Sequence, residues 1–304
     1  MIDKTKTKSI EWCTARLNYA EPWDHFLTKS LKPFVNSLVI AGIVDRYFWQ
    51  RGYEKGAHIL LAMRTDSQTL YELVLPSLNE HFYHYVEDLP STRPYELSDF
   101  EPNDTIQTGV YQPDIESWGG DIAMPIVERF QQASSDAVLD FMVVKEEKWS
   151  SVQALSTAFE LQLGFADSAG MKKAEAIQFF DFCLMRHVKE PFSLQLFEYI
   201  FKKQEVPLVD YTSKLWARLK KGNLFKEKYY NKYLENAYYT CEDVKLTFRN
   251  RGLEVEPKFS SIWELFAKLL GDTNKRLGLH GRHELLLYYA ILRSLEKVEV
   301  DEGY

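Results

Sequence analysis

The stretch from Asp45 to Arg64 reads DRYFWQRGYEKGAHILLAMR. Two runs of aromatic and aliphatic residues, 44–51 and 58–64, flank a short segment that contains two glycines. This pattern is typical of two antiparallel strands joined by a turn. Because side chains alternate between the two faces of a strand, four residues of the second run share one face: His58, Leu60, Ala62 and Arg64.

Strand and helix signals alternate on both sides of this strand pair. Residues 9–17 alternate like a strand, and the apolar spacing predicts a helix between Pro22 and Gly42. Asp66 is a candidate N-cap for a second helix, a Pro- and Ser-rich loop follows it, and a further strand is expected at 105–111. The N-terminal part therefore predicts a small, mainly antiparallel sheet with helices.

Nearly the whole chain after Gly120 has helical spacing, interrupted by glycines and prolines. The expected helices span 121–145, 149–166, 171–189, 191–204, 208–220, 225–250, 258–271 and 282–298. We therefore expect an α+β fold in a single domain, 1–304, with a sheet-containing part at 1–117 and a mainly helical part at 118–304.

Composition excludes several classes of function. A net charge of −7 opposes binding to nucleic acid. No apolar stretch is long enough to cross a membrane and no signal sequence is evident, so we expect a cytoplasmic protein. The three cysteines lie far apart, which excludes a disulfide framework and a zinc site of the usual spacing. No cofactor or metal is expected, and the choice between monomer and homodimer stays open.

Three other patterns have ordinary structural explanations. His81 and His84 could bind one metal ion from a helix, but no third ligand follows at a recognisable spacing, and we expect both to be exposed. The same holds for His280 and His283. Five tyrosines between 229 and 239 could form a wall for flat rings, although tyrosines that cover a core are the favoured interpretation.

The junction between the two parts, YQPDIESWGG at 111–120, carries more chemistry than a connector needs. Four side chains with polar groups stand beside a tryptophan and a glycine pair: Tyr111, Asp114, Glu116 and Ser117, with Trp118, Gly119 and Gly120. The residues alone leave two interpretations open. Either these groups serve a reaction, or Asp114 caps a turn, Tyr111 and Trp118 belong to the core, and His58 is a buried histidine with its hydrogen bonds satisfied.

This junction and the helix after it, YQPDIESWGGDIAMPIVERFQQASSDAVL, resemble the Y-x-P-E-x-x-R-Y-G-G loop and helix of the C-terminal elimination domain of class I lantibiotic dehydratases. The same domain occurs as a free-standing protein in thiopeptide pathways. Further points of resemblance are Trp12 in the first strand, the strand pair itself, and an S-x₇-L-L-G pattern from Ser261 to Gly271. The resemblance implies a modified precursor peptide with its leader as the partner.

The departures from the family pattern concern its cations. In the dehydratases the domain expels glutamate from a glutamylated Ser or Thr, and family arginines bind this anion. Leu60, Ala62 and Ser117 stand where relatives carry arginine, and a family histidine would fall near Trp263. Only Arg51 remains of the set. Each charge-assisted hydrogen bond contributes about 1.5–3 kcal/mol, so this site should bind glutamate poorly.

The resemblance offers a reaction without an anionic leaving group, because free-standing relatives are pyridine synthases. These join two dehydroalanines of an azole-bearing peptide in a formal [4+2] aza-cycloaddition, then lose water and the leader. The implied catalytic residues are Tyr111 and Asp114, then Glu116 and Ser117, with Arg51 and His58 flanking the cavity. The implied substrate-binding residues are Leu60, Ala62, Arg64, Trp118, Gly119, Gly120 and Trp263. A glutamate-eliminating lyase and a non-catalytic leader-binding module are the alternatives.

Overall fold

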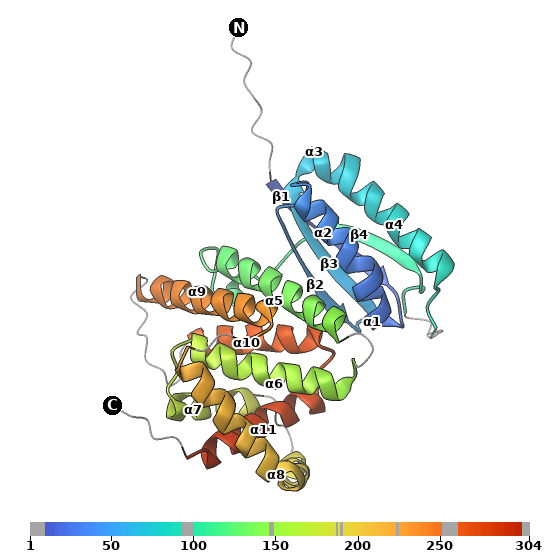
Figure 1. Ribbon diagram of the computed structural model, residues 1–304. Helices are drawn as coiled ribbons and strands as arrows, with labels where there is room; N and C mark the ends of the chain where they lie inside the picture. The colour runs from blue at the N-terminus through green and yellow to red at the C-terminus, as the bar shows by residue number, and fades with distance from the viewer. Residues whose placement is uncertain are drawn as a thin grey trace. The chain divides into compact units, whose positions relative to one another are not determined.

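The computed structural model describes residues 10–92, 100–145, 149–186, 188, 191–222, 225–250 and 261–299. The chain divides into two compact units, which Figure 1 shows as ribbons. The sheet unit comprises residues 1–114 and 138–147, and the helical unit comprises 115–137 and 148–304. Helix α5 (Met124–Val144) contributes its first part to the helical unit and its last part to the sheet unit.

The sheet unit has four antiparallel strands in the order β2-β3-β1-β4. Its strands are β1 (Ile10–Asn18), β2 (Arg46–Gly52), β3 (His58–Asp66) and β4 (Thr105–Val110). Its helices are α1 (Trp23–His25), α2 (Lys32–Ile40), α3 (Ser67–Thr69) and α4 (Leu75–Asp88), with π-helical stretches at Phe26–Leu31 and Leu70–Val74. This is a split β-α-β arrangement of the ferredoxin-like type, with α2 and α4 on one face of the sheet (Figure 1).

The strand register assigns every second residue of the sheet to the face that α2 and α4 cover. Cys13 pairs with Met63, Ala15 with Leu61, and Leu17 with Ile59, so these side chains share one face. The whole set on this face is buried, and Tyr47 and Trp49 of β2 complete it. Burial of this apolar surface is the main favourable contribution to the folding of the unit.

The helices over this face also pack against each other through aromatic rings. Phe26 meets Phe82 of α4 edge-on, with ring centroids 6.0 Å apart. His81 stacks on Phe34 of α2 at 4.8 Å, and its Nε2 lies 2.9 Å from the hydroxyl of Ser30. The expectation that His81 is exposed is therefore wrong, because its ring fills the contact between α2 and α4. His84 is exposed as expected.

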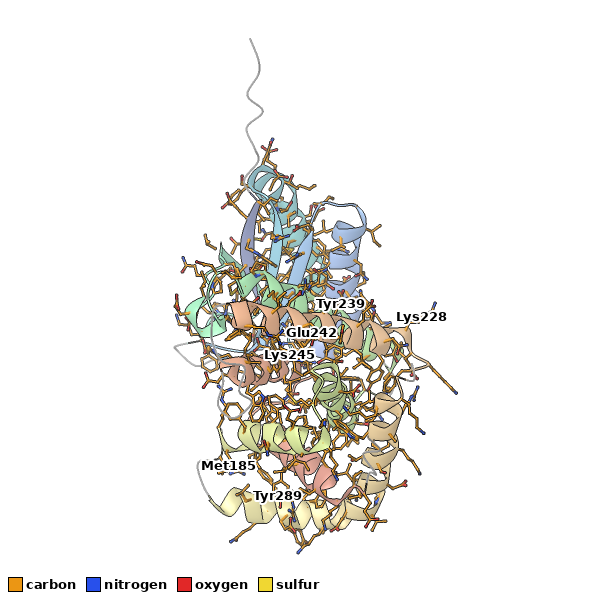
Figure 2. The ribbon with its side chains drawn as sticks, turned by 90° about the vertical axis from the view of Figure 1, so that its left-hand side faces the viewer. Met185, Lys228, Tyr239, Glu242, Lys245 and Tyr289 are labelled. Atoms are coloured by element: carbon orange, nitrogen blue, oxygen red, sulfur yellow. The ribbon has the colours of Figure 1, made fainter. Side chains whose placement is uncertain are left out.

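The helical unit contains α6 to α11 and the first part of α5. The helices are α6 (Ser151–Ser168), α7 (Lys173–Met185), α8 (Pro191–Lys220), α9 (Lys228–Asn250), α10 (Ser261–Arg276) and α11 (Arg282–Lys297). Helix α11 packs on α7 and α8, and α6 packs on α9. Figure 2 labels Lys228, Tyr239, Glu242 and Lys245 along α9 and Tyr289 on α11.

A buried polar network joins α5 to α10 in this unit. Arg276 is fully buried and donates to the hydroxyl of Ser134 at 3.2 Å and to the side-chain oxygen of Gln131. Gln131 also donates to Asp272 at 2.7 Å, and Ser134 lies 2.8 Å from the hydroxyl of Thr273. A buried guanidinium requires such hydrogen bonds, so the network fixes how α10 packs on α5.

Most elements match the expectations from sequence, and the α+β class is confirmed. Asp66 caps its helix by accepting from the backbone N–H of Thr69 at 3.1 Å. The expected helix break before Leu208 is wrong, since α8 continues through Pro207. Proline lacks the N–H for the helical ladder, but buried side chains on both sides of it, such as Phe201 and Leu215, hold the helix in place. Part of the expected loop after α4, residues 93–99, lies outside the described residues.

Gly52 at the end of β2 leaves room for the imidazole of His58. A methyl group on Gly52 would overlap the His58 ring, which is buried and bonded through Nδ1 to the carbonyl of Gly56 at 2.9 Å. We expect Gly52→Ala to lower the free energy of unfolding by about 1–3 kcal/mol, the usual cost of overpacking. Chemical denaturation measures this change. Gly109→Ala is the matched control, because its methyl group would lie 3.4 Å from Thr14 Oγ1; equal effects of the two substitutions would contradict the prediction.

Buried His58 and half-buried His81 of the sheet unit should make stability depend on pH. Burial lowers the pKa of His58 and of His81, so the folded protein resists their protonation. The unfolded chain binds these protons near the ordinary histidine pKa of about 6.5. The free energy of unfolding should therefore fall as the pH drops below about 6.5, and the loss should level off below the folded pKa values.

His58→Gln and His81→Gln should each reduce this pH dependence, measured by denaturant titrations at a series of pH values. His283→Gln serves as the control because His283 is exposed at the start of α11. The prediction fails if the pH profile of the free energy of unfolding has the same slope in His58→Gln and His81→Gln as in the wild type.

Candidate functional site

The face of the sheet opposite α2 and α4 carries most of the predicted site residues of the sheet unit. The register aligns its side chains in rows across the strands. One row consists of Phe48, Ala62, Thr14 and Gly109, and the next consists of Gln50, Leu60, Arg16 and Gln107. Leu60 and Ala62, where the sequence resemblance led us to expect arginine, therefore lie on the central strand β3 of this face.

Three aromatic side chains gather at one end of the face. Trp12 lies 5.3 Å from Phe48 and 5.4 Å from Tyr111 between ring centroids, and Phe48 and Tyr111 are 5.5 Å apart. Tyr111 follows β4 directly, so the strand delivers the first residue of the junction to this cluster. Sequence reasoning named Tyr111 as a site residue but missed that Trp12 and Phe48 surround it.

Two arginines on this face are held by protein acceptors, Arg64 beside Trp12 and Arg16 beside Leu60. Arg64 pairs in register with Trp12, lies 5.8 Å from its ring, and donates from Nε to both carboxylate oxygens of Asp45 at 2.9 and 3.1 Å. This guanidinium holds the pKa of Asp45 below its usual value. Arg16, next to Leu60, donates to the side chain of Asn18 at 2.8 Å and to the backbone carbonyl of Glu54.

Arg51 lies on the opposite face from His58. It pairs with Ile59, so the register turns it to the side that α2 and α4 cover. There it forms an ion pair with Asp24 at 3.0 Å and stacks over Trp23 at 5.3 Å. Arg51 and His58 therefore do not flank one cavity, as the sequence had led us to expect. His58 pairs with Gly52, the residue after Arg51, and neighbouring residues of a strand point to opposite faces.

His58 has the environment of a satisfied buried histidine. A carbonyl oxygen only accepts, so Nδ1 carries the proton that bonds to Gly56, and in the neutral ring Nε2 is the acceptor. Burial together with the nearby charge of Arg16 lowers the pKa of His58. The ring is therefore neutral at physiological pH and offers a proton acceptor rather than a cation.

The junction passes from the sheet unit to the helical unit between Asp114 and Ile115. The side chain of Asp114 is exposed. Glu116–Trp118 form a 3₁₀ turn in the helical unit, with Glu116 exposed. Gly119 and Gly120 both have positive φ, 91° and 85°, which residues with a side chain rarely adopt. This glycine pair turns the backbone towards α5, as the sequence predicted.

A lysine that the sequence did not single out contacts this turn. Lys268 of α10 donates to the backbone carbonyl of Ser117, and its ammonium lies 5.5 Å from the ring of Trp118. Lys268 follows Trp263 in the S-x₇-L-L-G segment, but its distance in sequence from the junction gave no signal. The turn therefore has one cation beside it.

Trp263 and the tyrosine run are mainly structural. Trp263 is buried, with its ring 5.7 Å from both Phe179 and Phe182 of α7. Tyr230 and Tyr233 are buried in the core, whereas Tyr238 and Tyr239 of α9 are about half exposed. Figure 2 labels Tyr239. The five tyrosines therefore do not form one wall, because the helical period distributes them over different faces.

The helical unit also contains an apolar hollow of about 600 Å³ between α6, α8 and α11. Phe159, Ile200, Phe201, Leu208 and Leu287 are among its lining residues, and Tyr211 at its edge donates to Glu160. None of the predicted site residues lines it. Within the described ranges, no group of three or more His, Cys, Asp or Glu side chains could hold a metal ion, and no helix is long and apolar enough to cross a membrane.

Several solved structures share this fold. The pyridine synthase TbtD from thiomuracin biosynthesis matches with a TM-score of 0.77 and 14% identity, over 93% of this chain and 97% of that chain. The tRNA-dependent lantibiotic dehydratase MibB from Microbispora sp. 107891 matches with a TM-score of 0.67 and 16% identity, over 97% of this chain but 28% of that chain. TsrL matches with a TM-score of 0.64 and 13% identity, over 95% of each chain.

Because the sequence identities are only 13–16%, these structural matches establish a shared fold and nothing about activity. No curated protein matches the sequence. The family model for the C-terminal part of lantibiotic biosynthesis dehydratases, however, matches residues 12–295 and so spans both units. The chain therefore belongs to the lantibiotic biosynthesis dehydratase C-terminal family.

Proposed function

We propose that this protein is a pyridine synthase of thiopeptide biosynthesis. It joins two dehydroalanines of an azole-bearing precursor peptide in a formal [4+2] aza-cycloaddition. The observation that carries the proposal is a pair of apolar side chains on the sheet face, Ala62 between Phe48 and Thr14 and Leu60 in the next row, at positions where the family resemblance implies arginine. The shared fold with TbtD, which the chain covers almost completely, supports it. The family match across both units favours one functional domain.

This reaction suits a site with few cations. One dehydroalanine and a neighbouring amide in its iminol form supply the four-atom component, and the second dehydroalanine supplies two atoms. Loss of water and of the leader as an amide then gives the pyridine without any net oxidation. Holding the two alkenes together can supply about 7–11 kcal/mol of the barrier, so positioning by the protein is the main requirement.

The proton transfers need only a few polar groups. The phenol of Tyr111 and the carboxylate of Asp114 are the first candidates for tautomerisation and water loss, with Glu116 and Ser117 as further ones. The neutral His58 lies on the same sheet face and could accept a proton at Nε2. Backbone N–H groups after Gly119 and Gly120 could hold a substrate carbonyl.

Elimination of glutamate is the second candidate function, and specific cations favour it. In the sheet unit, Arg16 lies beside Leu60, one of the positions where the family resemblance implies arginine. In the helical unit, Lys268 contacts Ser117, another such position. Each group would have to replace a family arginine in binding a carboxylate of glutamate. Arg64 is less suited, because Asp45 already holds its guanidinium.

Incubation with defined peptides and mass spectrometry test the proposal. A thiazole-bearing precursor with two dehydroalanines should give a macrocycle and free leader amide. Dehydration of a glutamylated peptide without cyclisation would overturn the proposal in favour of elimination. Tight binding of the leader without any conversion of either peptide would identify a non-catalytic binding module.

Removal of the Tyr111 hydroxyl should slow cyclisation without unfolding the protein. Tyr111→Phe keeps the ring that packs on Trp12 and Phe48 and removes only the proton donor. We expect kcat to fall by about 10²-fold or more, the usual contribution of general acid–base catalysis, with an unchanged Tm. Tyr83→Phe is the matched control, since Tyr83 is an exposed tyrosine of α4. A kcat for Tyr111→Phe within about twofold of wild type would remove Tyr111 from the mechanism.

A further inference from the structure

Trp12 and Phe48 have no role in the proton transfers, yet they lie beside Tyr111 on the sheet face of the proposed site. The three rings come from β1, from β2 and from the residue after β4. All three pairs of ring centroids are 5.3–5.5 Å apart, with interplanar angles between 48° and 71°. Such tilted contacts are the favoured geometry for aromatic pairs.

The position of this cluster is unusual for a two-layer sheet unit. One face of an antiparallel sheet is normally packed, and the other is expected to carry mainly polar side chains. In this unit α2 and α4 already cover the packed face, yet the other face gathers three large rings. Trp12 and Tyr111 both remain partly exposed, so the cluster keeps aromatic surface that another ring can contact.

The neighbouring row of the sheet has little side-chain bulk. Beside Phe48 this row contains Ala62, Thr14 and Gly109. A methyl group on Gly109 would meet a single described atom within 4 Å, Thr14 Oγ1 at 3.4 Å. Phe48 and Ala62 are themselves buried, so a flat group approaches the cluster at the partly exposed rings of Trp12 and Tyr111.

Arg64 adds a planar cation to the same cluster. Its guanidinium lies 5.8 Å from the ring of Trp12, and Asp45 holds it through Nε. Tryptophan, tyrosine and arginine together are typical of surfaces that hold flat heterocycles by stacking, because every such ring presents a π face.

We propose that Trp12, Phe48 and Tyr111 form the subsite that holds an azole ring of the substrate peptide by aromatic contact. This inference rests on the proposed function, which supplies an azole-bearing substrate. The subsite places the azole on the same sheet face as Leu60, which is partly exposed and lies along the path of the adjoining peptide in the proposed site. Tyr111 then has two roles, because its ring contacts the azole and its hydroxyl serves proton transfer.

Binding of two matched peptides tests this subsite without any turnover. Both peptides carry the same fluorescently labelled leader and intact serines; one has thiazoles and the other has the unmodified cysteines. Fluorescence anisotropy gives the Kd of each. We expect wild type to prefer the thiazole peptide by about tenfold, within the usual range for stacking of a flat ring on aromatic side chains.

Trp12→Leu and Phe48→Leu should each reduce this preference to about twofold or less, whereas Trp12→Phe should largely retain it because a ring remains. Tyr239→Leu is the control for loss of an aromatic side chain, since Tyr239 is exposed on α9, and it should leave the preference unchanged. Thermal unfolding shows whether each variant is folded.

A second measurement covers the case in which the leucine variants do not fold. The emission of Trp12 is the difference between the spectra of wild type and Trp12→Phe, and the thiazole peptide should change it while the cysteine peptide should not. The inference is overturned if wild type shows no preference for thiazole, if folded leucine variants keep it, or if the Trp12 emission responds equally to both peptides. Because neither peptide can cyclise, these results are independent of whether the cyclisation assay succeeds.

Discussion

The antiparallel register between β1 and β3 is the constraint on which the candidate site depends. It sets Trp12 opposite Arg64 and Thr14 opposite Ala62, and it sends Leu17, Ile59 and Leu61 to the helix-covered core. A slip of one residue would exchange the two faces and bury the arginines under α2 and α4. Because the apolar side chains must lie on the core face, the same register determines which side chains lie on the opposite face.

The same constraint explains the distribution of positive charge. The sequence resemblance implied arginine at Leu60 and Ala62, and the row of Phe48, Ala62, Thr14 and Gly109 contains no charged residue. Arg16 lies beside Leu60 and Arg64 lies beside Trp12, and each is held by protein acceptors. An anion would have to compete with those acceptors, whereas an uncharged peptide would not.

In the helical unit, a buried polar network determines where Lys268 lies. Its network around Arg276 fixes α10 on α5, and α10 in turn carries Lys268 to the turn at Ser117. A fully buried guanidinium tolerates little displacement, because any lost hydrogen bond would leave a buried donor unsatisfied. The position of Lys268 at this turn thus depends on a buried polar contact elsewhere in the same unit.

The sequence by itself determined the local elements, because the information for them is local. Period-two alternation located β3 and its two faces, Asp66 marked a helix start, and the Gly119-Gly120 pair marked the turn before α5. The short motifs of the junction also identified the family, which the match over residues 12–295 confirms. Pro207 misled the prediction, because packing along α8 outweighs a local breaker.

Only the tertiary structure decided which distant residues meet. Trp12, Phe48 and Tyr111 are far apart in the chain, and strand order and register bring their rings together. Arg51 and His58 are close in sequence, yet the pairing of Arg51 with Ile59 separates them onto opposite faces. Lys268 reaches Ser117 across a long separation in sequence. Such contacts follow from pairing and packing between elements, which no periodicity within one segment encodes.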